Sequence, residues 1–169
     1  DSQVSTIGFV IAATLLMFLI LLRSALMAVA GVVPNVLAAA IVLGIMGYAG
    51  IPLDMMTITI AAIIIGIGVD DAIHYLHRYR QERAHGLTVP DAIKNSHRHT
   101  GIALYFTSLI VMIGFSVLAF SNFVPTVYFG ILTAMAMLMA LLVNLTILPS
   151  LLMLSSRLSF RMRLRGQNT

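Results

Sequence analysis

The chain has 169 residues, of which 60% are hydrophobic and only 9% are charged, and its mean hydropathy is +1.02. This composition excludes an ordinary soluble domain and predicts a protein that lies in a lipid bilayer. The sequence contains no cysteine, which excludes disulfides and thiolate sites for metals or redox chemistry.

Five apolar runs are long enough for membrane-spanning helices, which need about 20 apolar residues each. The predicted fold class is therefore an all-α membrane protein, a polytopic bundle of five transmembrane helices within residues 1–154. A basic cytoplasmic tail is predicted at 155–169. The first run lacks the features of a cleaved signal peptide, and a chain that begins with "DSQVST" is expected to be a fragment of a longer protein. The predicted spans are 4–22, 25–48, 55–75, 102–121 and 127–154.

The connection between the third and fourth spans, residues 76–100, is predicted to lie in the cytoplasm and to contain a short helix. The sequence "TVPD" at Thr88–Asp91 is a capping box with a proline in the first turn of a helix. We therefore expect a surface helix over about 89–97. Its simplest role is that of a solvated linker, which we prefer to a binding site.

The basic residues predict the orientation of the spans, because Lys and Arg collect in cytoplasmic connections. If the five helices alternate in direction, all ten Lys and Arg fall on one side of the membrane. The charged residues expected on the other side are then only Asp1 and Asp54. The amino terminus is then outside and the tail is cytoplasmic, in a plasma membrane. This topology explains the net charge of +4 without nucleic-acid binding, and the tail could also lie on anionic lipid. The basic residues are Arg23, Arg78, Arg80, Arg83, Lys94, Arg98, Arg157, Arg161, Arg163 and Arg165.

Two adjacent aspartates, Asp70 and Asp71, end the apolar run of the third span in "GIGVDDAIHYLHRY". An ionised carboxylate in hydrocarbon costs about 3 kcal/mol or more, and two neighbouring carboxylates disfavour each other's ionisation. Such a pair is typical of a proton carrier. Gly66 and Gly68 lie one turn before the acids and predict close helix packing there. The alternative is that the acids lie at the membrane interface and reach water or Arg78.

Other polar residues give weaker signals. Thr107 and Ser108 lie in the fourth span at a depth comparable to that of the acids, and are the best candidates to contact them. Ordinary interhelical packing is the simpler role for the remaining polar residues, among them Asn144. The histidines at 74, 77, 97 and 99 lack the spacing of a closed metal site, so no metal is expected. No nucleophile motif or phosphate loop occurs, so we expect no enzymatic activity.

An ordered set of motifs over residues 50–154 resembles the resistance-nodulation-division (RND) exporters, in particular their MMPL-like and sterol-sensing-domain-like branch. The motifs are the "GxxxDD" element at 66–71, its continuation "DAIHYLHRYR", the pair Thr107–Ser108, "GF" at 114–115, "FG" at 129–130 and "LPSLL" at 148–152. The resemblance implies that the five spans are the second to sixth of a six-helix half, and the basic tail suggests the carboxy-terminal half.

The resemblance also implies a function: the membrane portion of a transporter that is driven by the proton-motive force and exports hydrophobic or lipid-like substrates. Asp70 and Asp71 match the proton-relay acids of the family, and Thr107 matches a polar relay position, beside which lies Ser108. The implied partners are the lipid bilayer, the hydrophobic or amphiphilic substrate and the other half of the transporter, and a homo-oligomer is left open. No cofactor is expected, because the proton gradient supplies the energy. The usual cationic partner of the acids has no match here. The alternative is a sterol-sensing-like lipid-binding or regulatory membrane module that does not pump.

Overall fold

The computed structural model describes the backbone of residues 2–51 and 55–165 and the side chains of residues 8–9, 12–51, 59–60 and 62–155. Within this described part the backbone is almost entirely helical and none of it lies in a β-strand. The predicted all-α fold class is therefore confirmed.

The helices follow the apolar runs of the sequence closely. The predicted second span coincides with its helix. The helices that contain the predicted first and fifth spans extend beyond those spans. In chain order the elements are α1 (Ser2–Leu22), α2 (Ala25–Tyr48), α3 (Met55–Ala84), α4 (Val89–Ser96), the π-helical turn η1 (His97–Gly101), α5 (Ile102–Ser116), the 3₁₀ turn η2 (Val117–Phe120) and α6 (Val124–Arg165).

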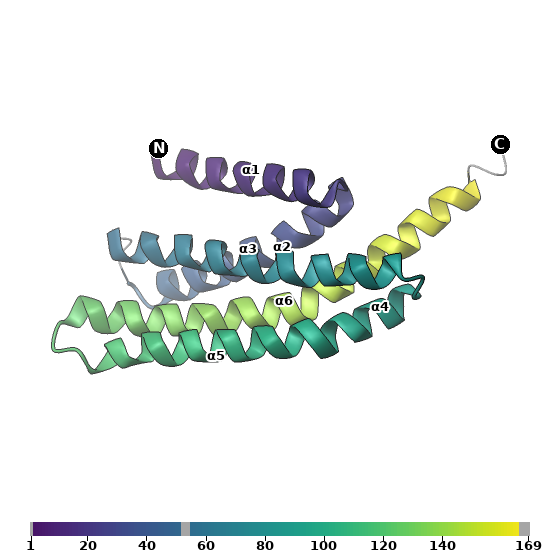
Figure 1. The fold of residues 1–169 in the computed structure, drawn as a ribbon. Helices are drawn as coiled ribbons and strands as arrows, with labels where there is room; N and C mark the ends of the chain where they lie inside the picture. The colour runs from purple at the N-terminus through teal and green to yellow at the C-terminus, as the bar shows by residue number, and fades with distance from the viewer. Residues whose placement is uncertain (1, 52–54, 166–169) are drawn as a thin grey trace.

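The long helices lie side by side and run back and forth along one direction (Figure 1). Helix α6 is central to the bundle, because it packs against α2, α3 and α5, and α2 also packs against α1 and α3. Helix α4 packs against the carboxy-terminal part of α3. The connections between successive long helices therefore gather at the two ends of the bundle.

Two clusters of buried side chains form the core, one toward each end of the bundle. Small residues lie where helices approach closely, as at Ala38 of α2 and at Ala136 and Ala140 of α6, all fully buried. Such residues let helix backbones come near each other, which is how helices pack in a membrane. The second cluster contains larger groups, among them Tyr75 and Leu76 of α3.

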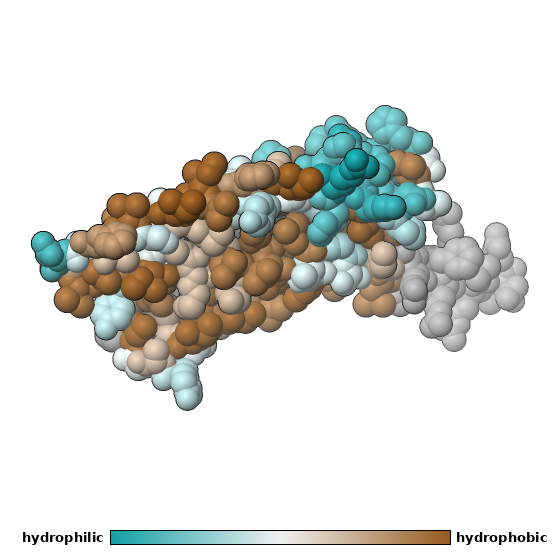
Figure 2. Space-filling view, turned by 90° about the horizontal axis from the view of Figure 1, so that it is seen from below, coloured by the Kyte–Doolittle hydropathy of each residue, from teal (hydrophilic) through white to brown (hydrophobic). Residues whose placement is uncertain are grey.

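The outer surface is largely apolar, in contrast to that of a soluble protein. Figure 2 shows hydrophobic residues along the length of the molecule and hydrophilic ones gathered mainly at one end. On α5, Phe106 is 56% exposed and Ile110 is 68% exposed. Buried positions include polar residues such as Asn35 and Asn144. This distribution is the one expected of helices that face lipid.

Three helical stretches within the described residues are long and apolar enough to cross a membrane: Ala25–Tyr48, Val89–Phe120 and Val124–Ser155. A shorter apolar helix covers Ala12–Leu22. Helix α3 is not among these stretches, and part of its apolar run, at 55–58 and 61, lies outside the residues whose side chains are described. The chain is thus a membrane protein by these spans, and the exact set of five crossings stays a prediction.

The region 76–100, which was predicted as a connection, is largely helical. Helix α3 continues to Ala84, because Leu76 and Tyr79 are buried and pack with Ala92 and Ile93 of α4. The expected surface helix is present as Val89–Ser96, and the backbone N–H of Asp91 donates to the Thr88 hydroxyl at 3.4 Å. From α4 the chain passes through the π-helical turn directly into α5.

The described residues of the basic connections lie at one end of the bundle. The Arg80 side chain of α3 donates to the carbonyl oxygen of Leu21 at 3.1 Å, so the carboxy-terminal part of α3 lies beside the turn between α1 and α2. That turn holds Arg23. The Leu21 carbonyl is in the last turn of α1, where carbonyl groups lack helical partners and cations are favoured. The grouping supports the predicted topology, and the side on which each terminus lies stays a prediction.

Candidate functional site

The two adjacent aspartates of α3 face different surroundings. Consecutive residues of an α-helix point about 100° apart, so two adjacent side chains can differ widely in exposure. The Asp71 residue is only 5% exposed, whereas the Asp70 side chain is 69% exposed. The alternative that both acids simply reach out to water at the interface is therefore wrong for Asp71 within the described part of the chain.

Both acids line a cavity of about 570 Å³ between α3 and the helix formed by η1 and α5. One residue of α6, Met137, completes the wall. The cavity therefore brings together the four predicted relay residues, Asp70, Asp71, Thr107 and Ser108. Their side chains are not hydrogen-bonded to one another. The full lining is Ile67, Asp70, Asp71, His74, Arg78, His99, Thr100, Ala103, Leu104, Thr107, Ser108, Val111 and Met137.

Buried oxygens on two sides of this cavity lack a hydrogen-bond partner among the described residues. They are Oδ2 of Asp71 and Oγ of Ser108, which is 2% exposed. A buried polar atom without a partner is costly, and its presence requires an explanation such as a proton, water or ion. The hydroxyl of Thr107 differs, because it donates to the carbonyl oxygen of Leu104 in its own helix at 3.0 Å. Of the two hydroxyl residues, Ser108 is the one left available to an acid.

The glycines before the acids are placed differently from each other. A Cβ atom at Gly68 would lie 2.1 Å from Oδ1 of Asn35 on α2, so only glycine fits there without displacing that side chain. At Gly66, a Cβ atom would meet no described atom within 4 Å. The close packing predicted at Gly68 is therefore present, and the packing predicted at Gly66 has no partner in the described residues.

A polar bridge that joins three helices lies one turn before the acids. The amide nitrogen of Asn144 on α6 lies 3.3 Å from Oδ1 of Asn35 and 3.2 Å from the carbonyl oxygen of Gly68. The amide nitrogen of Asn35 in turn donates to the carbonyl oxygen of Gly31 at 2.9 Å. The sequence favoured ordinary interhelical packing for Asn144, and the structure adds these hydrogen bonds. The role of Asn35 was not predicted, since its signal was no more than an amide within an apolar helix.

The accessible acid has a basic neighbour, His74, which lies on the same face of the helix. Nε2 of His74 lies 3.5 Å from Oδ1 of Asp70, one helical turn away. Within the described residues, no group of three or more His, Cys, Asp and Glu side chains is placed to hold a metal ion. In this arrangement His74 is a neighbour of the acids at the cavity.

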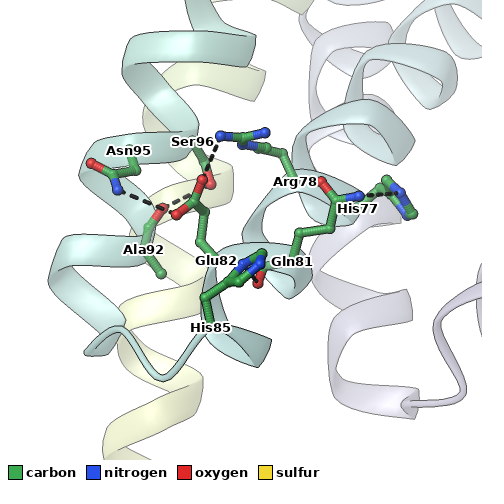
Figure 3. Close-up of polar contacts among 8 residues, drawn as sticks. All are labelled: His77, Arg78, Gln81, Glu82, His85, Ala92, Asn95 and Ser96. Carbon is green, nitrogen blue, oxygen red and sulfur yellow. Dashed lines mark hydrogen bonds and ion pairs between the residues drawn. The ribbon is translucent and has the colours of Figure 1, made fainter.

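An ion pair lies on the same helix, two turns further toward the carboxy terminus. Figure 3 shows Arg78 directed at Glu82, with Asn95 of α4 on the other side of the carboxylate. Nη2 of Arg78 is 2.6 Å from Oε1 of Glu82, and the Asn95 amide donates to Oε2 at 3.2 Å. The hydrogen bond from Asn95 and then the charge and hydrogen bond of Arg78 lower the pKa of Glu82, although burial opposes them. Glu82 is thus held as a carboxylate that ties α4 to α3.

Comparison with known proteins places these features in a family. The family model described as MMPL family matches residues 1–168. Among curated proteins, the chain is 31% identical over 157 residues to the membrane protein MJ1562 of Methanocaldococcus jannaschii, a match that covers 93% of this chain and 40% of that protein. It is 31% identical over 149 residues to the hopanoid transporter HpnN of Burkholderia multivorans, covering 83% of this chain and 16% of the transporter.

A further relative is the hopanoid transporter HpnN of Rhodopseudomonas palustris, 29% identical over 107 residues, with coverage of 60% of this chain and 12% of the transporter. The chain therefore spans less than half the length of each of these relatives. They agree with the resemblance that the motifs indicated.

Proposed function

The chain belongs to the MMPL family, and from this premise we propose that it is part of the membrane domain of a proton-driven exporter of hydrophobic or lipid-like substrates. Two of its relatives are named as hopanoid transporters, which supports a polycyclic lipid as the substrate class. Because the chain covers only a fraction of those proteins, the transporter would be completed by further segments, including a second half.

The observation that carries the proposal is the buried Asp71 at the wall of the cavity. Its Oδ2 has no hydrogen-bond partner among the described residues, and no described cation lies in contact with it. A carboxyl in such surroundings is most stable when it holds a proton. It can release that proton when water or a cation reaches it, and this is the property that a proton-driven transporter needs.

The roles of the remaining site residues follow from their positions. Asp70, the more accessible acid, exchanges protons with the cavity, and Asp71 holds a proton further inside. Ser108 offers a hydroxyl that can both donate and accept beside the buried acid. Thr107 lies at the same cavity with its hydroxyl bonded to its own helix, and has a smaller part.

The orientation proposed from the basic residues gives the direction of proton flow. The end of the bundle that holds the Arg80 contact to Leu21 is cytoplasmic, and the chain lies in the plasma membrane with its amino terminus outside. Protons then enter from the outer side and leave toward the cytoplasm, and the movement of helices that accompanies this exchange drives export.

The experiment uses the full-length protein that contains this chain, reconstituted into vesicles of phosphatidylethanolamine, phosphatidylglycerol and a hopanoid. A pH-sensitive dye inside the vesicles reports proton entry after the outside is acidified. The wild type is expected to carry protons faster than protein-free vesicles, and Asp70→Asn with Asp71→Asn is expected to return the rate to that of protein-free vesicles.

The matched control is Asp91→Asn, the same change of acid to amide in the exposed first turn of α4. It should leave proton entry unchanged. Unchanged proton entry in the double variant would overturn the proposal. A wild type that binds the hopanoid and carries no protons would instead favour the sterol-sensing-like module that does not pump.

A further inference from the structure

His74 lies within one helical turn of both acids. It is four residues after Asp70 and three after Asp71, the two spacings at which side chains on a helix are neighbours. Its Nε2 is 3.5 Å from Oδ1 of Asp70, and its side chain is 65% exposed at the cavity. An exposed imidazole therefore lies beside the more accessible acid at the cavity.

The other titratable groups at this cavity are few. Besides the two acids and His74, helix α3 contributes Arg78, and the turn η1 contributes His99. The cavity-lining residues of α5 and α6, such as Thr107, Ser108 and Met137, carry no group that titrates near neutral pH. Among these described groups it is His74 that contacts Asp70, at 3.5 Å, so a proton that leaves Asp70 toward the basic end has His74 as its acceptor.

The next turn of α3 ends this series of proton acceptors. Arg78 is four residues after His74, and a guanidinium keeps its proton in proteins and cannot accept another. Its Nη2 is held by Glu82 at 2.6 Å, and Glu82 is held by Asn95 of α4. The guanidinium is therefore drawn toward α4 and away from the carboxylate pair, which leaves His74 as the basic group in contact with an acid.

We propose that His74 is the proton carrier between the aspartate pair and the cytoplasmic end of the cavity. This inference rests on the proposed function. In the first step the protonated carboxyl of Asp70 gives its proton to the neutral Nε2 of His74, which forms a carboxylate and an imidazolium. In the second step the imidazolium releases a proton to water at the cavity mouth, and Asp70 receives the next proton from Asp71.

Imidazole chemistry suits this position. It is the side chain that gains and loses a proton between about pH 5 and 8, so it can both accept and release one at cytoplasmic pH. The arrangement moves protons only, with no oxidation and no leaving group.

The test measures proton entry into the hopanoid-containing vesicles described above, with the full-length protein. His74→Ala is expected to slow entry about 100-fold, which is within the effect of one positioned proton-transfer group. In a parallel experiment the vesicles are loaded with histamine, an imidazole whose ammonium group slows its passage through a bilayer, because the cytoplasmic side of the protein faces the vesicle interior in this assay. Histamine should restore much of the rate, because the exposed site of His74 leaves room for the ring.

Propylamine, which carries the ammonium but no imidazole, should restore nothing, and this result separates proton transfer from a charge effect. The matched control is His77→Ala, because His77 is exposed, lies in the same helix and contacts Gln81 at 3.2 Å instead of the acids. That variant should keep the wild-type rate with or without histamine. His74→Gln serves as a second variant that keeps a polar side chain and should be equally slow.

The outcomes separate this inference from the function on which it rests. Proton entry at the wild-type rate in both His74 variants, with loss of entry in the double aspartate variant, would overturn the role of His74 and leave the proton-driven function intact. Slow entry that histamine fails to restore would also overturn it. If the double aspartate variant keeps the wild-type rate, both proposals fail together.

Discussion

The two sides of helix α3 differ in how their buried polar groups are partnered. Toward α2 and α6, the amide nitrogens of Asn35 and Asn144 and the carbonyl oxygen of Gly68 are hydrogen-bonded to one another or to nearby backbone, and within this bridge it is Oδ1 of Asn144 that lacks a partner among the described residues. Toward the cavity beside α5, Oδ2 of Asp71 and Oγ of Ser108 have no partner among the described residues. The first side holds the helices together, and the second leaves groups available for protons.

This difference predicts that substitutions on the two sides will separate stability from transport. A residue of the packed side should change the free energy of unfolding. A residue of the cavity side should change proton movement and leave stability nearly unchanged. The following experiments use the full-length protein that contains this chain and are ordered by the size of the expected effect on stability.

The largest effect is expected from Gly68→Ala. The added methyl group would lie 2.1 Å from Oδ1 of Asn35, a buried side chain that must then leave its hydrogen bonds. We expect a loss of about 1–3 kcal/mol of stability, the usual cost of overpacking. Thermal unfolding in detergent measures it.

Gly66→Ala is the matched control, since its added methyl group meets no described atom within 4 Å. Alanine is favoured over glycine in a helix by about 1 kcal/mol, so this variant should melt at the same temperature as the wild type or higher. Equal losses of stability in both variants would contradict the difference between the two glycines.

A smaller effect is expected from Asn144→Ala. The change removes the donor that reaches both Asn35 and the carbonyl oxygen of Gly68 and leaves two buried acceptors without it. Interhelical hydrogen bonds in membranes contribute roughly 0.6 kcal/mol on average, so we expect a loss of about 1 kcal/mol. The control Thr146→Ala removes an exposed hydroxyl that bonds only within α6, at 2.6 Å from the Leu142 carbonyl oxygen. If both variants melt alike, the bridge does not stabilise the bundle.

The smallest effect concerns Glu82 and depends on pH. Because its pKa is lower in the folded protein than the ordinary value of 4.5, the ionised form favours folding. This contribution is complete above about pH 4.5 and disappears as the pH falls through the lower folded value. The melting temperature of Glu82→Gln should therefore be below that of the wild type at pH 7, and the gap should close in acid. A gap that is constant with pH would show that the carboxylate charge is not the cause.

Much of this arrangement could be predicted from the sequence, because apolar runs of membrane length and a capping box are local signals. The helix at 25–48 and the cap at Thr88 are examples. The end of α3 was less predictable, since the span boundary follows bilayer thickness, whereas the helix continues to Ala84 while Leu76 and Tyr79 still find partners on neighbouring helices.

The different environments of the two aspartates could not be read from their order in the chain. The rotation of α3 decides which acid faces inward, and that rotation is set by contacts distant in sequence, such as that of Gly68 with Asn35 and Asn144. For the same reason the contact between His74 and Asp70 follows from helix spacing, but the cavity that gives it a use depends on where α5 lies.

The single variant Asp71→Asn tests the central claim most directly, because it combines both measurements in one protein. If the buried acid is kept for its proton, the neutral amide should leave the melting temperature unchanged or raise it, since a buried ionisable group is costly. Proton entry into hopanoid-containing vesicles should fall to the rate of protein-free vesicles. A variant that melts well below the wild type and still carries protons at the wild-type rate would contradict the account.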